Sequence, residues 1–357
     1  MDLGLIVYAL NLASIYALMA IGISILWSSV GIINMAHGAT FAVSGYSAWL
    51  VTSALKPGIA AAFGNTAMAS FVTAGALVGS ALVAGALCGV IIYLLAFLPI
   101  HDKPNFQVRA LIITLGLNIA AVQGLLWTFG PRNQGLPKIF GFGRWDIWGT
   151  KIRFDQAGTI IGAAIIMALT LSWLRFSRRG LEVRAMMQNA EGAAYSGISR
   201  QVTALPVLML TGALAGMAAA LLSQTIFVSP TAGVIPLVKG LTIALLGGLG
   251  SVPGAMVGAL LVGFLEAIVG TIPFLGQRYV MFATFLFIIA VLIVRPRGIG
   301  GLLDATRECL PASTTRSGAG PGNGGSLPRA EPSGPVDGCP GPSGTGCNGA
   351  TSTTRRR

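Results

Sequence analysis

The sequence predicts an all-α, polytopic integral membrane protein: a helical bundle of about eight to ten spans, some broken at glycine-rich positions. Three observations support this prediction. Hydrophobic residues make up 54% of the 357 residues and charged residues only 10%, whereas soluble domains carry roughly 25% charged residues. The apolar residues gather in long runs, and several runs are short or rich in glycine. So few charges cannot cover a water-facing surface, which excludes a soluble globular enzyme and, for most of the chain, disorder.

The apolar runs are the candidate spans. They lie at residues 3–27, 32–51, 67–98, 110–129, 158–174, 205–227, 236–248, 253–268 and 280–294. Most can cross a hydrocarbon core of about 30 Å, which needs about 20 helical residues. The first run has no basic segment before it and is longer than the apolar part of a signal peptide, so we expect a retained helix. The short, glycine-rich runs predict broken helices packed inside the bundle.

The distribution of charge orients the bundle. The formal net charge is +12, with 23 Lys and Arg against 11 Asp and Glu. No platform of aromatic and basic residues for stacking bases is present, so we expect no nucleic-acid binding. The basic excess instead fits loops on the cytoplasmic face of a membrane. Two such places hold Arg175, Arg178, Arg179, Arg184 and Arg200, and then Arg295 and Arg297.

The chain divides into two parts. Residues 1–300 form the predicted transmembrane domain, with a cytoplasmic loop at 177–203 and an outer loop at 130–156. The outer loop is itself basic, which conflicts with a simple charge rule and leaves the span count at eight to ten. Residues 311–357 are rich in Gly, Pro, Ser and Thr, so we expect a disordered tail that is dispensable for function.

Reactive side chains are scarce. The chain has four cysteines and two histidines, without the spacing of a metal site or a disulfide framework. No Ser/His/Asp set or pair of carboxylates lies within the apolar runs. We therefore expect no catalytic residues and no metal.

The loop 177–203 has the pattern of an amphipathic helix. Apolar residues recur on one helical face and polar residues on a second, at the spacing i, i+4, i+7 and i+11. The two faces hold Val183, Met187, Ala190 and Ala194, and Arg184, Gln188, Glu191 and Tyr195. Such a helix between two spans either docks on a partner or lies on the membrane surface.

Four motifs in this order resemble one family of transporters. Glu191-Gly192-Ala193 with Gly197-Ile198 is similar to the E-A-A-x-x-x-G coupling loop of ABC importer permeases, although Gly192 replaces the usual Ala. The other three motifs are residues 31–38, Lys239 through residues 247–254, and residues 295–298. Together they resemble the branched-chain amino acid permeases of the LivH type, over residues 5–300.

The resemblance implies a transport subunit that depends on ATP hydrolysis by partner subunits. The chain holds no G-x-x-x-x-G-K-[ST] loop, so ATP and Mg would be used by two cytoplasmic ATPase subunits, and this chain would bind no cofactor itself. The implied ATPase-docking residues are Arg184, Gln188, Glu191 and Gly197. The other implied partners are a second membrane permease subunit and a periplasmic or extracellular substrate-binding protein. The implied location is the plasma (inner) membrane of a prokaryote, with the chain crossing the bilayer many times.

Two glycine-rich breaks, one in each half, are candidates for the translocation pathway. Broken helices present polar backbone at membrane depth. The candidates are Asn34, His37 and Gly38 in the first break and Gly247, Gly248 and Gly250 in the second. The alternative for the first is a helix–helix turn in which His37 satisfies backbone. The alternative for the second is close helix packing through small residues.

Lys239 and Glu266 are the basic and the acidic residue that lie well inside the C-terminal runs. Ionisable groups in a membrane usually face a partner or an aqueous path. Both are therefore pathway candidates in the outer half. A structural ion pair, or Lys239 reaching toward the interface, is the alternative.

The outer loop 130–156 mixes cations with Phe140, Phe142, Trp145 and Trp148. This composition suits an interface with a binding protein. It equally suits an aromatic belt at the membrane surface.

Three other functions stay open. A urea or short-chain amide ABC permease shares much of the motif pattern. An autonomous channel or secondary transporter would need a coupling-ion site, and buried carboxylates are scarce. A membrane-embedded enzyme has the least support, because the spans lack a catalytic constellation.

Overall fold

The structure is a computed structural model, and it describes residues 3–63, 67–136, 138, 143–147, 150–272, 276–294 and 298. The predicted tail at 311–357 and the predicted cytoplasmic Arg295 and Arg297 lie outside these residues. The elements in chain order are α1 (Leu3–Val30), α2 (His37–Phe63), α3 (Ala67–Ile92), the π-helix η1 (Tyr93–Phe97), α4 (Phe106–Phe129), β1 (Arg144–Ile147), β2 (Thr150–Arg153), α5 (Phe154–Phe176), α6 (Arg178–Gln188), α7 (Ala190–Tyr195), α8 (Arg200–Leu222), α9 (Val234–Gly247), α10 (Val252–Thr271) and α11 (Gly276–Val294).

The predicted all-α membrane bundle is confirmed. Within the described residues, six helices are long and apolar enough to cross a membrane: α1, α3 with η1, α4, α5, α8 and α10. The 27-residue α2 contains Lys56 and Pro57, and α9 and α11 are shorter apolar helices. Six helices of span length are fewer than the expected eight to ten spans, so that count stays a prediction, with α2, α9 and α11 as the further candidates.

Helix α1 is the centre of the bundle. In its most apolar 18-residue window, 94% of the residues are buried within the protein itself, and it packs against α5, α8, α9 and α10. By contrast, only 17% of the corresponding window of α4 is buried. A helix that is apolar on all sides is suited to this central position, because it meets protein in every direction.

Glycine allows α3 and α8 to approach closely. A Cβ atom added at Gly85 of α3 would lie 2.9 Å from the carbonyl carbon of Gly212 in α8. One added at Gly89 would lie 3.0 Å from the Cα atom of Met209. Small residues serve the same purpose at helix contacts in membrane proteins generally, because they bring the backbones together.

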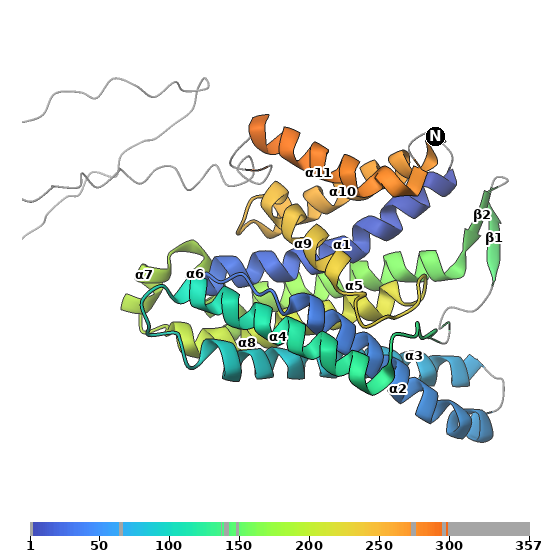
Figure 1. Ribbon diagram of the computed structural model, residues 1–357, viewed down its shortest axis with the longest axis horizontal. Helices are drawn as coiled ribbons and strands as arrows, with labels where there is room; N and C mark the ends of the chain where they lie inside the picture. The colour runs from blue at the N-terminus through green and yellow to red at the C-terminus, as the bar shows by residue number, and fades with distance from the viewer. Residues whose placement is uncertain are drawn as a thin grey trace, which may run out of the picture. The chain divides into compact units, whose positions relative to one another are not determined.

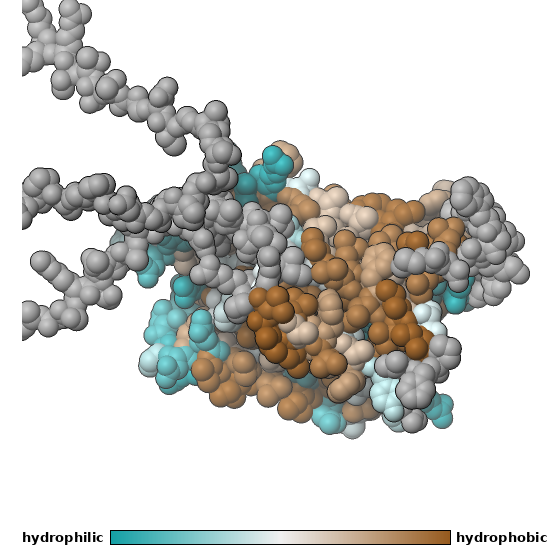
Figure 2. All heavy atoms as spheres, turned by 90° about the horizontal axis from the view of Figure 1, so that it is seen from above, coloured by the Kyte–Doolittle hydropathy of each residue, from teal (hydrophilic) through white to brown (hydrophobic). Residues whose placement is uncertain are grey.

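The bundle has two distinct ends. Helices α6 and α7 lie at one end, while the β1–β2 hairpin and the N-terminus of α1 lie at the other (Figure 1). Hydrophobic side chains cover the middle of the face seen in Figure 2, and hydrophilic side chains gather toward the ends. An apolar band between polar ends is the surface expected of a protein whose middle lies in hydrocarbon.

Two helices begin inside the bundle. The Met35 amide donates to Thr114 Oγ1 at 3.2 Å, and Thr114 lies eight residues after the start of α4, roughly 12 Å along that helix. Helix α2 therefore starts well below the end face. The first residues of α2 and α9 meet there: a Cβ added at Gly38 would lie 2.9 Å from the Gly233 carbonyl oxygen. The predicted broken helices are present at this position.

Candidate functional site

The loop 177–203 forms two short helices rather than the single helix that the apolar periodicity predicts. Ser177 caps α6 by accepting from the Gly180 amide at 2.8 Å. At Asn189 the backbone becomes extended, and the Asn189 side chain accepts from the Gly192 amide at 3.0 Å. Because Asn competes with the helical backbone in this way, it ends α6 and begins α7. Because of this break, the predicted apolar face does not continue along one side: Val183 is buried, but Ala194 is exposed.

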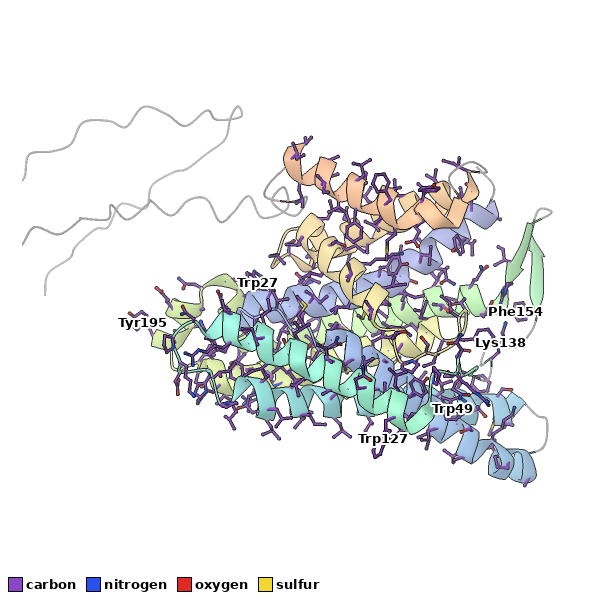
Figure 3. The ribbon with its side chains drawn as sticks, viewed as in Figure 1. Trp27, Trp49, Trp127, Lys138, Phe154 and Tyr195 are labelled. Atoms are coloured by element: carbon purple, nitrogen blue, oxygen red, sulfur yellow. The ribbon has the colours of Figure 1, made fainter. Side chains whose placement is uncertain are left out.

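Helix α7 is an exposed projection. Glu191 is exposed, and Tyr195 has 93% of its surface exposed and lies at the α6/α7 end in Figure 3. The helix ends in a Schellman motif, since Ile198 N donates to Ala193 O and Gly197 N donates to Ala194 O, both at 3.0 Å. Gly197 has φ +83°, a conformation that glycine adopts without steric cost. The spacing from Glu191 to Gly197 is thus the length of one capped helix.

Two of the predicted docking residues differ in their surroundings. Gln188 is exposed. Arg184 is half-buried, and its Nη2 donates to the Arg175 carbonyl oxygen at 3.0 Å. Arg184 therefore ties α6 to the end of α5 instead of projecting from the surface.

A groove of about 510 Å³ lies beside α7. The turn between η1 and α4 forms its opposite wall, and its lining includes Asp102, Glu191 and Arg200. The turn is held by ring stacking of Phe97 on His101, with ring centroids 5.9 Å apart, and by a contact between the side chains of His101 and Gln201. The end face therefore offers both a projection and a polar recess.

The first glycine-rich break is a buried turn. The Asn34 side chain accepts from the Ala36 amide at 3.0 Å, and the Asn34 carbonyl accepts from the His37 amide at 3.3 Å. His37 is 1% exposed, its Nε2 atom has no hydrogen-bond partner, and its ring packs against Gly22 of α1. Asn34 thus satisfies backbone, whereas His37 retains an unused polar atom at membrane depth.

The second break lies at the α6/α7 end, in the turn from α9 to α10. A Cβ added at Gly247 would lie 2.5 Å from the Ala255 amide nitrogen. Gly248 and Gly250 have φ +89° and +101°, and Gly250 N donates to Ser24 Oγ of α1 at 3.3 Å. These contacts favour the alternative of close packing for this turn, and its place on a pathway stays a prediction.

Lys239 and Glu266 form an ion pair inside the bundle. Lys239 Nζ lies 2.7 Å from Glu266 Oε1 and 2.8 Å from Oε2, and it donates to the hydroxyl of Tyr16 at 2.8 Å. The Lys239 side chain is 6% exposed and the Glu266 side chain 13%. All three ammonium donors have acceptors, and the opposite charges neutralise each other, which favours the structural alternative over substrate contact.

Tyr16 was missed by the sequence analysis. It lies in the middle of the first apolar run and contacts Lys239 across 223 positions of sequence. The Lys239 ammonium also lies 4.8 Å from the centroid of its ring. The available signal was a Tyr hydroxyl in the middle of a mostly apolar helix, because a buried Tyr hydroxyl usually has a partner.

The outer loop contains the hairpin of β1 and β2, in which Arg144 is opposite Arg153. The buried carboxylate of Asp155, which is 2% exposed, pairs with Arg153 at 2.5 Å and with Lys138 at 3.4 Å. Lys138 and Phe154 mark this end in Figure 3. Phe140, Phe142 and Trp148 lie outside the described residues, and nothing is described of the Trp145 side chain, so the proposed aromatic interface stays a prediction.

Among the described residues, no group of three or more His, Cys, Asp or Glu side chains is placed to hold a metal ion.

A multi-pass helical bundle from which the short helix α7 projects, with Glu191 exposed and Gly197 at its end, has the architecture of a membrane transport subunit. Residues 5–294 match the family described as branched-chain amino acid transport system / permease component, and the chain belongs to this family. It is 31% identical to the high-affinity branched-chain amino acid transport system permease protein LivH of Escherichia coli K12, over 82% of this chain and 92% of that protein.

Two further relatives give the same result. The LivH protein of Salmonella typhimurium is 31% identical over 82% of this chain and 92% of its own length. The permease protein BraD of Pseudomonas aeruginosa is 29% identical over 83% of this chain and 94% of its own length. No solved structure matches the chain.

Proposed function

We propose that this chain is the membrane permease subunit of an ATP-driven ABC importer that moves branched-chain or related amino acids, delivered by an external binding protein. It pairs with a second membrane permease subunit and two cytoplasmic ATPases in the plasma membrane of a prokaryote. The ATPases bind and hydrolyse ATP with Mg, and this chain acts without a nucleotide site, a cofactor or a catalytic residue of its own.

One observation carries the proposal: α7 is an exposed, capped helix between two spans, in a chain of this permease family that lacks a nucleotide-binding loop. Glu191 and Tyr195 are exposed on it, and Gly197 fixes its end. Gln188 is exposed at the end of α6, next to the break. A short rigid helix with exposed polar and aromatic side chains suits a groove on a partner protein.

The connections of α7 support a mechanical role. On one side, α6 is tied to α5 through the Ser177 cap and through Arg184. On the other side, Ser199 accepts from the Val202 amide at 3.3 Å and begins α8. Both α5 and α8 pack against the central α1. Movement of α7 by a closing ATPase is therefore passed to two spans at once, and the bundle shifts between two states according to their relative free energies.

For the pathway, the interior start of α2 has the strongest support among the predicted positions. It lies at membrane depth, and His37 there has a buried polar atom without a partner. A helix N-terminus carries partial positive charge and free amide groups, which suit the carboxylate of an amino acid. Asn34 and Gly38 would shape this position rather than contact the substrate.

The experiment measures uptake of leucine into vesicles that contain the complete complex. Uptake is compared with and without ATP on the ATPase side, and with and without the added binding protein. Uptake is expected to require both ATP and the binding protein. Glu191→Gln should lower uptake and ATPase coupling, whereas Glu182→Gln, the same change on α6, should leave both near normal. Both variants should insert into the membrane equally.

Three results would contradict the proposal. Uptake by the chain alone, driven by a proton or sodium gradient, would identify a secondary transporter. Uptake of urea in place of leucine would identify an amide permease. Normal coupling in Glu191→Gln would remove α7 from the docking surface.

A further inference from the structure

A pocket of about 440 Å³ lies at the α6/α7 end, between α5, α6 and the turn that leads into α10. Two arginines line it, Arg175 and Arg184, together with apolar residues that include Leu171, Leu174, Met187 and Val252. No aspartate or glutamate is among the described residues of its lining. The function proposed above uses two residues of its lining, Gln188 in ATPase docking and Arg184 as the link from α6 to α5, but assigns no ligand to the pocket.

The described lining of the pocket carries two positive side chains and no carboxylate. Arg184 donates to the backbone carbonyl oxygen of Arg175, so the Arg184 guanidinium contacts the end of α5, and Arg184 Nε is buried without a hydrogen-bond partner. Helix α10 also begins here, with Ser251 as its cap, and its N-terminus adds partial positive charge. Two guanidinium side chains and a helix N-terminus that line one pocket favour an anion in it.

The surroundings of the pocket indicate which anion. The pocket lies where the span α5 ends and the span α10 begins, which is the depth at which lipid headgroups are found. Along α5, exposed Ala164, Ala168 and Leu171 follow one another on the face that leads to Arg175. These exposed side chains are all apolar, and they form the apolar track that leads to the cationic residues. A phosphate with an attached hydrocarbon chain matches both parts, whereas a carboxylate on a docked protein would not need the track.

We propose that this pocket binds the headgroup phosphate of an anionic phospholipid from the leaflet on the α6/α7 side. Arg175 and Arg184 hold the phosphate oxygens, since a guanidinium matches phosphate geometry with paired donors. An acyl chain lies along α5. Arg184 thereby serves the lipid site and the α5–α6 contact, and ATPase docking is left to Gln188, Glu191 and Gly197.

The test uses the full chain, purified in detergent and mixed with phosphatidylglycerol or phosphatidylcholine, with bound lipid measured by native mass spectrometry. Phosphatidylglycerol is expected to be retained in preference to phosphatidylcholine. Arg175→Gln and Arg184→Gln should each weaken its retention about ten-fold, the effect of losing one hydrogen bond between charged groups. Arg178→Gln makes the same charge change on an exposed residue outside the pocket lining and should retain the lipid.

The exposed Arg175 keeps the test decisive if Arg184→Gln misfolds. Equal loss in Arg178→Gln would mean that binding follows net charge alone, and would overturn the proposal. Full competition by millimolar inorganic phosphate would overturn the lipid assignment. Unchanged lipid retention, combined with reduced ATPase binding in both pocket variants, would make the pocket a protein contact. None of these results depends on transport, so failure here is distinct from failure of the proposed function.

Discussion

The buried ion pair gives the sharpest test of the fold, and the perturbation is Glu266→Gln. The carboxylate lies 2.7 Å from the Lys239 ammonium, a separation at which opposite charges attract by about 6 kcal/mol at an effective dielectric constant of 20. Desolvation offsets part of this attraction, and breaking a buried pair costs about 3–5 kcal/mol. The variant leaves a buried ammonium with the Tyr16 hydroxyl and a neutral amide. We expect a loss of about 3 kcal/mol, or a fall of about 10 °C in melting temperature.

The assay is the thermal unfolding of the full chain in detergent, for single and double variants. Tyr16→Phe, which removes one acceptor, should cost about 1–2 kcal/mol. Replacing both charges, Lys239→Met with Glu266→Leu, should restore most of the lost stability, because a well-packed apolar pair removes the desolvation cost. A double variant less stable than Glu266→Gln would refute this reasoning. If the double variant regains stability but loses uptake in the complete complex, the pair acts on the substrate after all.

Three further predictions concern other parts of the bundle. Gly197→Ala should strain the end of α7 by about 1–2 kcal/mol at φ +83° and lower ATPase binding. Gly197→Asn should retain more ATPase binding than Gly197→Ala. Equal ATPase binding by the unchanged chain and both variants would show that the cap is unimportant. Gly212→Val should abolish accumulation of folded protein, because α3 leaves no room for a side chain; Gly124→Val, where a Cβ meets nothing within 4 Å, is the control in the same expression assay. Asp155→Asn should leave two cations beside a neutral amide and speed proteolysis of the outer loop, while an unchanged cleavage rate would mean that this carboxylate does not hold the hairpin.

The spans could be predicted from sequence because each depends on local composition. The apolar runs at 3–27 and 205–227 became α1 and α8 with small changes in their bounds. The spacing from Glu191 to Gly197 came from the resemblance to the E-A-A-x-x-x-G loop, and the structure shows that the capped helix α7 occupies it. The spans are set by neighbouring residues of the chain, so a single sequence carries them.

The remaining features depend on contacts that periodicity does not record. The spacing from Val183 to Ala194 continues without interruption through Asn189, yet the side chain of Asn189 accepts a backbone hydrogen bond and divides the helix. The polar face that held Arg184 gave no sign that its guanidinium turns back to α5. Tyr16 and Lys239 meet only because α1 and α9 cross in space, and that crossing is a property of the assembled bundle.

The central position of α1 has a consequence for biosynthesis. The helices that cover it, α8 to α10, follow it by some two hundred residues in the chain and are made later. Until then its Tyr16 hydroxyl and the side chain of Asn11, both buried in the finished protein, face lipid or the insertion machinery. The burial of α1 is therefore complete only once α10 is in place.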